Sequence, residues 1–263
     1  MISTWRNFFL LKYCTLPLLS SQKRFWELDF FRGCAVLGMI VFHAFFIVKF
    51  SQNSILEMYQ TGWLVLARSI QVTFLTLVGI SLVISYFRAR EKGNVTLFYE
   101  RQMKRALILI VLGILLSFIT FIFLPGYFIR FGILHVIGMS VLTLIPVVPQ
   151  KHRALVFSVL ILVLGYFRRS LGTSSYALYI FGFYRELVPT LDYFPIFPWM
   201  GFVAFGIFLG HFFYPHGNRK WNLPEMENFF GKCIVFMGKR ALIIYLIHIP
   251  ILLISFFVMG VIS

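Results

Sequence analysis

Three residues near the N-terminus place an acid, a base and an imidazole within one apolar run. In the stretch ELDFFRGCAVLGMIVFHAFF, residues 27–46, Asp29 lies three positions before Arg32, and His43 lies eleven positions after Arg32. An α-helix turns roughly 100° and rises about 1.5 Å per residue, so Arg32 and His43 would share one face about 16 Å apart along the axis. Asp29 can pair with Arg32 across one turn.

The chemistry that these residues favour is proton or acyl transfer. Histidine is suited to general-base work or to accepting an acyl group near neutral pH. Of the nine acidic residues, only Asp29 fits the edge of a bundle core, which leaves His43 as the candidate for proton transfer at depth. The structural alternatives are a hydrogen-bonded core histidine, a helix-start acid and an arginine that reaches the interface.

Further polar residues interrupt later apolar runs. His135 lies in RFGILHVIGM, His248 lies in IYLIHIP, and Arg68 and Gln71 lie in the outer half of the second apolar run, residues 62–87. Polar residues inside lipid are costly and often mark functional sites, although each of these could serve structure alone. The sequence contains no G-x-S-x-G, no HExxH and no P-loop, and the three cysteines have no metal-site spacing. No metal site is therefore expected.

The composition predicts an all-α integral membrane protein. Hydrophobic residues make up 60% of the 263 positions and charged residues 13%, with a mean hydropathy of +0.87. A soluble domain has about 25% charged residues. A span needs about 20 apolar residues. The sequence therefore predicts a bundle of about seven transmembrane helices, over residues 30–50, 62–87, 105–124, 131–149, 153–167, 194–214 and 240–261.

The charge distribution predicts the orientation. Of the 24 Lys and Arg residues, 17 lie in the N-terminal segment and in alternate loops, 5 lie in the intervening loops, and Arg32 and Arg68 lie within spans. The positive-inside rule then places the N-terminus in the cytoplasm and the C-terminus outside. Because the basic residues flank apolar runs, the net charge of +15 indicates membrane orientation rather than nucleic-acid binding.

Two segments fall outside this pattern of spans. Residues 1–23 contain an apolar run that is too short to span and is broken by Pro17, which favours an interfacial segment over a signal peptide. The transmembrane domain would then cover residues 24–263. Residues 170–199 form the longest outer connection and are rich in aromatic side chains. They would form either a cap over the outer mouth or an interfacial aromatic belt.

At these motifs the chain resembles the transmembrane acyltransferase family of heparan-α-glucosaminide N-acetyltransferase, in its prokaryotic form with the catalytic domain only. ELDFFRGCAVLGMIVFH is similar to the family's opening helix, in which D-x-x-R-G precedes a histidine. FLTLVGISLVIS, RFGILHVIGMSVL, DYFPIFPWMGFVAFGIFLG and GKRALIIYLIHIPILL are similar to later blocks in the same order, over about residues 24–255. The spacing of Arg32 and His43 is also similar to the R-x10-H pattern of the larger acyltransferase-3 family.

The resemblance implies a substrate pair and a role for each candidate residue. The donor would be acetyl-CoA presented from the cytoplasm, and the acceptor a sugar, amino sugar or glycan on the outer side. Asp29 and Arg32 would bind the donor, and His43 would act as base or acyl carrier. The acceptor side would be shaped by Arg68, His135, Asp192, Trp199 and His248.

Other functions remain open at this point. A transporter or flippase of a small polar metabolite is the main alternative, and a non-catalytic membrane scaffold is another. The expected location is the cell membrane, with membrane lipids as neighbours. The acceptor's identity, N- versus O-acetylation, direct versus ping-pong transfer and the oligomeric state, including a homodimer, are left undetermined.

Overall fold

The computed structural model describes residues 24–52, 61–168, 170–186 and 188–260. Their main elements are helices, with two isolated β-bridges, and the predicted interfacial segment 1–23 lies outside these ranges. The elements are α2 (Trp26–Ser51), α3 (Thr61–Glu91), α4 (Val95–Phe123), α5 (Ile133–Leu144), η2 (Ile145–Val147), α6 (Lys151–Phe167), η3 (Tyr176–Leu178), α7 (Ile196–Phe213), η4 (Pro215–Gly217), α8 (Phe229–Lys239) and α9 (Ala241–Val258).

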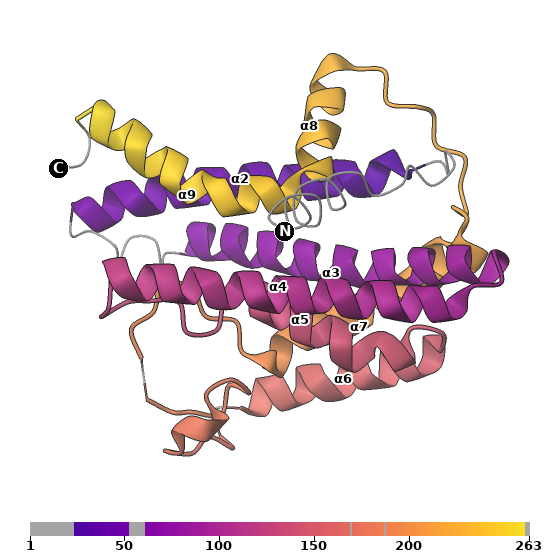
Figure 1. The fold of residues 1–263 in the computed structure, drawn as a ribbon, viewed down its shortest axis with the longest axis horizontal. Helices are drawn as coiled ribbons and strands as arrows, with labels where there is room; N and C mark the ends of the chain where they lie inside the picture. The colour runs from indigo at the N-terminus through magenta and orange to yellow at the C-terminus, as the bar shows by residue number, and fades with distance from the viewer. Residues whose placement is uncertain (1–23, 53–60, 169, 187, 261–263) are drawn as a thin grey trace, which may run out of the picture.

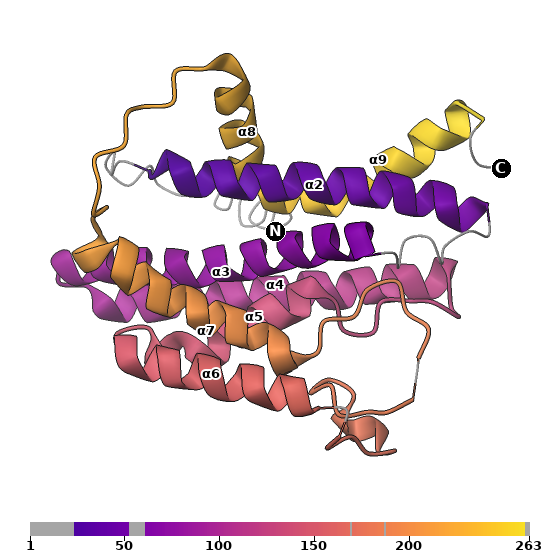
Figure 2. The ribbon, with the colours of Figure 1, turned by 180° about the vertical axis from the view of Figure 1, so that it is seen from behind.

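The long helices lie side by side along one axis, as Figures 1 and 2 show from opposite sides. Each of the seven predicted spans coincides with a helix, namely α2, α3, α4, α5 with η2, α6, α7 and α9. By length and composition, five of the described helices could cross a membrane: α2, α3, α4, α7 and α9. The prediction of an all-α membrane bundle is therefore confirmed, while α5 and α6 are shorter than these five helices.

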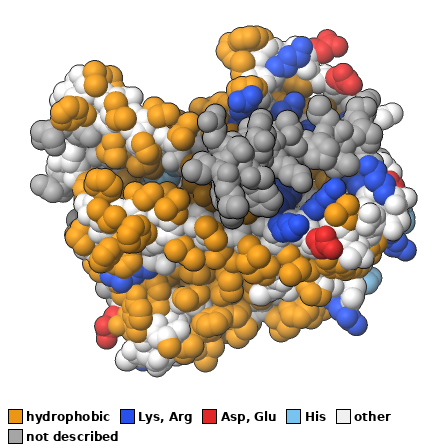
Figure 3. All heavy atoms as spheres, viewed as in Figure 1, with side chains coloured by type: hydrophobic (Ala, Val, Ile, Leu, Met, Phe, Trp, Pro, Cys, Tyr) orange, Lys and Arg blue, Asp and Glu red, His pale blue; other side chains and the backbone are white. Residues whose placement is uncertain are grey.

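The molecular surface fits a lipid environment. Hydrophobic side chains cover most of the face shown in Figure 3, and many of the Lys and Arg side chains gather toward the end where α2 begins and around α8. α4 shows this plainly, because Val111, Phe118 and Ile122 are each more than half exposed along its length. Such a surface would be unfavourable in water and is normal for helices that face lipid tails.

One helix was not predicted from the sequence. The expected loop between the sixth and seventh spans contains α8, which stands roughly perpendicular to the long helices in Figure 1. At its C-terminal end, a Cβ atom added at Gly238 would overlap the backbone carbonyl of Asp29. Gly33 of α2 approaches the backbone of Ile234 in the same way. The absence of side chains at both glycines lets α8 cross the first turns of α2 in direct contact.

α5 begins deep within the bundle rather than at its end. The imidazole of His135 in the first turn of α5 packs on Gly113 of α4, ten residues before α4 ends at Phe123. The chain therefore folds back by about 15 Å between α4 and α5. Non-helical backbone at such depth is tolerated in membranes only where it is buried in protein or lines a cavity.

The α3–α7 contact forms the centre of the core. Leu75 and Val83 of α3 and Val203 and Ile207 of α7 are fully buried. Gly79 of α3 lies against the carbonyl of Val203, and Gly206 of α7 lies against the carbonyl of Thr76. These reciprocal contacts bring the two backbones together, as small residues do at helix interfaces in membranes.

Replacing Gly79 with Ala should destabilise the bundle, because the new methyl group would overlap the α7 backbone. Overpacking of this kind costs about 1–3 kcal/mol, which corresponds to a fall in apparent Tm of roughly 2–12 °C for a chain of this size. The measurement is thermal unfolding in detergent. Gly62→Ala is the matched control, because no atom lies within 4 Å of a Cβ placed there. Equal Tm values for the two variants would contradict the close α3–α7 contact.

Candidate active site

His43 and His248 meet between α2 and α9. Their ring centroids are 4.9 Å apart, in an edge-to-face arrangement with an interplanar angle of 68°. His248 is buried and His43 is half-buried. The helices bring together two imidazoles that lie more than 200 positions apart in the sequence. Sequence analysis named both residues, but it proposed His43 as base or acyl carrier and His248 as part of the acceptor side.

Backbone hydrogen bonds determine which nitrogen of each ring carries a proton. Nδ1 of His43 lies 2.9 Å from the carbonyl oxygen of Met39, and Nδ1 of His248 lies 2.6 Å from that of Tyr245. A carbonyl oxygen only accepts, so Nδ1 is the donor in both rings. In the neutral imidazole the lone pair then resides on Nε2. Nε2 of His248 is buried and has no hydrogen-bond partner among the described residues.

Tyr245 is a neighbour that sequence analysis missed. Its ring lies 5.7 Å from that of His248, one turn earlier on α9. Its hydroxyl is also within electrostatic range of Asp192, which belongs to the segment before α7. The spacing Tyr245-x-x-His248 places both side chains on one face of a helix and was the signal available in the sequence.

Asp29 and Arg32 form the expected pair near the start of α2. Nη1 of Arg32 donates to Oδ1 of Asp29, and Nη2 donates to Oγ of Ser81 on α3 at 2.6 Å. The Arg32 side chain is 25% exposed, whereas that of Asp29 is 7% exposed. The guanidinium is therefore held between α2 and α3 with one part still accessible.

Asp192 and His135 meet at the start of α5. Oδ2 of Asp192 accepts the backbone N–H of Ile133 at 3.1 Å, and Nδ1 of His135 accepts that of Gly132 at 3.2 Å. Asp192 lies in a connecting segment, outside the spanning helices. Burial raises the pKa of its carboxyl to about 7, against the opposing effect of the N–H groups of Ile133 and Tyr193. This carboxyl can therefore exchange a proton near neutral pH.

Arg68 and Trp199 form a separate contact between α3 and α7. The guanidinium carbon of Arg68 lies 5.1 Å from the centroid of the Trp199 ring, and Nη1 donates to Gln71 at 3.0 Å. The indole of Trp199 is buried and also packs on Phe194. Among the described residues, neither Arg68 nor Trp199 makes a hydrogen bond or ring contact with His43 or His248, so the predicted acceptor residues fall into distinct groups.

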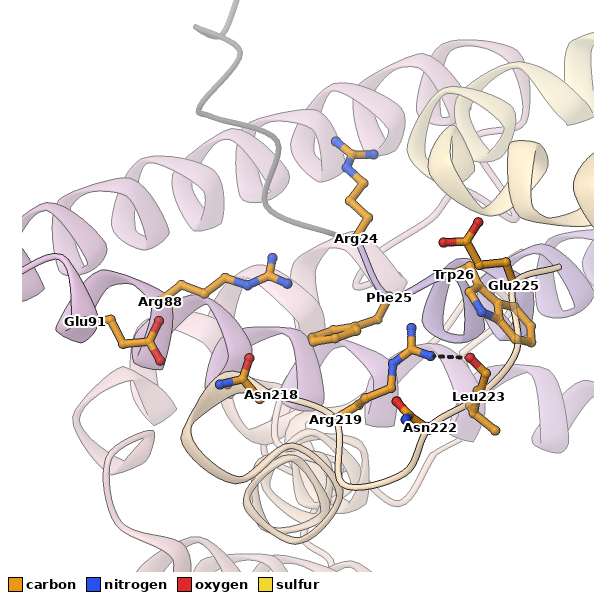
Figure 4. Close-up of a pocket in the computed structure, with 11 residues that line it drawn as sticks. Arg24, Phe25, Trp26, Arg88, Glu91, Asn218, Arg219, Asn222, Leu223 and Glu225 are labelled. Atoms are coloured by element: carbon orange, nitrogen blue, oxygen red, sulfur yellow. Dashed lines mark hydrogen bonds between the residues drawn. The ribbon is translucent and has the colours of Figure 1, made fainter.

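A basic pocket lies at the end of the bundle where α2 begins, as Figure 4 shows. Its volume is about 420 Å³. The guanidinium groups of Arg88 and Arg219 lie over the ring of Phe25, at 5.0 and 5.4 Å. The pocket is lined by Arg24, Phe25, Trp26, Arg88, Glu91, Gly217, Asn218, Arg219, Asn222, Leu223 and Glu225.

A buried acid attaches the pocket wall to α2. Oε1 of Glu27 accepts the hydroxyl hydrogen of Tyr214 at 3.1 Å, and Oε2 lies 3.3 Å from Nη2 of Arg219. Sequence analysis counted Arg24 and Arg219 only as orientation signals, because the pocket depends on segments that are far apart in the chain. Within the described ranges, no cluster of His, Cys, Asp and Glu could hold a metal ion.

Comparison with known proteins identifies the family. The family model described as heparan-alpha-glucosaminide N-acetyltransferase, catalytic, matches residues 24–250. The chain belongs to this family. The predicted resemblance is therefore confirmed over nearly the whole chain. A search of curated proteins and a search of solved structures each found no match.

Membership in the heparan-alpha-glucosaminide N-acetyltransferase catalytic family gives the chain a general function. Together with its long apolar helices, membership makes the chain a multi-pass membrane protein and an acetyltransferase. The matched range begins at Arg24 and ends at Pro250, so it includes both histidines, the Asp29–Arg32 pair and all the residues of the basic pocket.

Replacing Asp192 with Asn should make stability less dependent on pH. The raised pKa of about 7 lies above the value of about 3.9 for an unfolded Asp. The stability that the protonated carboxyl contributes is fully present below about pH 4 and is lost as the pH rises through about 7. Asn keeps an oxygen for the N–H of Ile133 and does not ionise. As the pH rises from about 4 to about 7, the Tm of wild type should therefore fall relative to that of Asp192→Asn.

The measurement is apparent Tm in detergent from about pH 5 to about pH 8, a range that includes the raised pKa. Glu186→Gln is the control, because Glu186 is an exposed carboxylate in the same connection between α6 and α7. Parallel pH profiles for wild type and Asp192→Asn would contradict the raised pKa.

Proposed function

We propose that the protein transfers an acetyl group from acetyl-CoA, bound at the basic end, to a sugar, amino sugar or glycan that enters from the other side. The observation that carries this proposal is the pair formed by His43 and His248. In both rings the Nδ1–H group donates a hydrogen bond to a backbone carbonyl of the same helix. The lone pair on Nε2 of His43 would therefore act as the base.

The donor would lie along α2. Its phosphates would bind in the basic pocket beside Phe25, where Arg88 and Arg219 supply charge-assisted contacts. From Phe25 to Arg32 the helix rises about 10 Å, and from Arg32 to His43 about 16 Å. The latter distance is comparable to an extended pantetheine arm.

Two cations would bind the donor between the pocket and the histidines. Arg32 is partly accessible beside Asp29. Arg105 of α4 adds a second guanidinium whose charge interacts with that of Arg32. Positive charge along this path favours the anionic donor and supports its entry from the end where α2 begins.

The transfer step needs one base. Nε2 of His43 would take the proton of the acceptor's hydroxyl or amine while the oxygen or nitrogen attacks the thioester carbonyl. The carbon–sulfur bond then breaks, and the thiolate of coenzyme A takes a proton from the imidazolium. In the alternative course, Nε2 itself attacks the thioester, and the acetyl group passes from His43 to the acceptor.

The acceptor would approach from the end of the bundle that contains Asp192 and His135. Tyr245 connects that region to the histidine pair, because its ring packs beside His248 and its hydroxyl interacts electrostatically with Asp192. Arg68 and Trp199 would contribute a cationic aromatic surface nearer the outer end of α3.

Replacing His43 with Ala should lower the rate of transfer by about 10²–10⁴, the usual contribution of a general base. The measurement is release of free coenzyme A from acetyl-CoA by purified protein with a panel of sugars, amino sugars and glycans. His152→Ala is the matched control, because His152 is an exposed histidine at the start of α6. Wild-type turnover in His43→Ala would exclude His43 from the reaction.

Wild type and His43→Ala also distinguish direct transfer from transfer through an acetylated His43. With labelled acetyl-CoA and no acceptor, an acetyl-imidazole intermediate would leave label on the wild-type protein and none on His43→Ala. Absence of label together with sequential kinetics would indicate direct transfer.

Replacing Arg88 with Gln should raise KM for acetyl-CoA by about tenfold, since a charge-assisted contact contributes about 1.5–3 kcal/mol and solvent screening reduces it at a partly exposed site. KM for acetyl-pantetheine, which lacks the nucleotide, should be unchanged. Lys92→Gln is the control, because Lys92 is exposed just beyond α3 and does not line the pocket. An equal rise in KM for both donors would contradict nucleotide binding there.

A further inference from the structure

α8 has two distinct faces. Gly231, Val235 and Gly238 are buried, and Gly238 lies against the backbone of Asp29 in α2. On the outward side, Phe229 and Phe230 are each 74% exposed and Phe236 is 55% exposed. Such large exposed aromatic side chains on a short helix require a partner, because exposed apolar clusters of this kind mark interaction surfaces.

Basic side chains border the aromatic face. With a turn of about 100° per residue, Lys232 and Lys239 fall on one flank of the outward side, while Phe230 falls on the other and Phe229 and Phe236 lie between them. Arg240 ends the helix, with its guanidinium 4.7 Å from the ring centroid of Phe236. A helix with lysine on one flank and phenylalanine on the other is typical of helices that lie in a membrane interface.

The position of α8 fits that environment. Gly238 contacts the backbone of Asp29 and Gly33, so α8 crosses α2 within its first turns. Figures 1 and 2 show α8 roughly perpendicular to the long helices. If the long helices cross the bilayer, a helix perpendicular to them at this level lies in the plane of the leaflet at the basic end.

We propose that α8 is an in-plane helix that binds anionic phospholipid in the leaflet where α2 begins. Phe229, Phe230 and Phe236 insert at the boundary of the acyl chains. Lys232, Lys239 and Arg240 contact the phosphate groups. Charge complementarity favours lipid over a second copy of the chain, because a symmetric contact through this face would bring the same lysines together.

Cys233 provides a direct probe, since it is exposed on the outward side, about one turn after Phe229. Cys14→Ser and Cys34→Ser leave it as the one thiol for bimane labelling. The labelled protein is reconstituted in nanodiscs that contain acyl-brominated phosphatidylcholine or acyl-brominated phosphatidylglycerol at equal mole fraction. Quenching by bromine reports contact with acyl chains, and quenching by aqueous iodide reports exposure to water.

We expect strong quenching by brominated lipid, weak quenching by iodide and stronger quenching by the brominated anionic lipid than by the zwitterionic one. In Lys232→Gln/Lys239→Gln the two lipids should become equal, whereas Lys92→Gln should leave the preference unchanged. The position control is Glu227→Cys with Cys14, Cys34 and Cys233 all replaced by Ser, because Glu227 is exposed before α8 begins. Its label should be quenched mainly by iodide.

Three outcomes would overturn the proposal. Iodide quenching at position 233 equal to that at position 227 would place α8 in water. Equal quenching of the unmutated helix by the two brominated lipids would remove the anionic specificity. Protection from both quenchers would show that protein, and not lipid, covers this face. None of these results depends on acetyl transfer.

Discussion

Lipid tails offer no hydrogen-bond partner, so every polar side chain within the bundle must be satisfied by the protein itself. This constraint explains the arrangement around α2. Arg32 finds Asp29 on its own helix and Ser81 on α3. His43 and His248 each donate to a carbonyl of their own helix. Nε2 of His248 and Nε1 of Trp26 are exceptions among the described residues, because both are buried without a hydrogen-bond partner.

Close backbone contacts hold these groups at their positions. Gly33 and Gly238 let α8 rest directly on the first turns of α2, and Gly79 and Gly206 do the same for α3 and α7. The contact between α3 and α7 forms a rigid centre, while α2, α8 and α9 pack at its side and carry the histidines. A basic pocket lies at the end where α2 begins, and the folded-back segment between α4 and α5 lies toward the other end, so the two ends of α2 have different surroundings. That asymmetry suits a reaction in which an anionic donor and a sugar acceptor approach from opposite sides.

Local sequence patterns were sufficient for much of this description. Long apolar runs indicated the membrane helices, because a bilayer requires about 20 apolar residues per span. The pairing of Asp29 with Arg32 followed from a three-residue spacing within one helix. Sequence reasoning did not find α8, because an eleven-residue amphipathic helix among basic residues resembles a polar loop. It also placed the start of α4 ten residues too late, since the first turns of that helix carry charged side chains beyond the apolar run.

The sequence by itself determined that the chain is a helical membrane protein of this acetyltransferase family and that His43 shares a helix with Arg32. Only the tertiary structure decided that His248 faces His43, that the ring of Tyr245 packs beside His248, and that Arg24, Arg88 and Arg219 surround one pocket. The physical reason is the distance along the chain over which a sequence pattern is informative. Spacing along one helix follows from its fixed rise and twist, whereas the neighbours of α9 depend on close contacts between helices that are distant in the chain. Periodicity cannot reveal those contacts when a helix is apolar on every face.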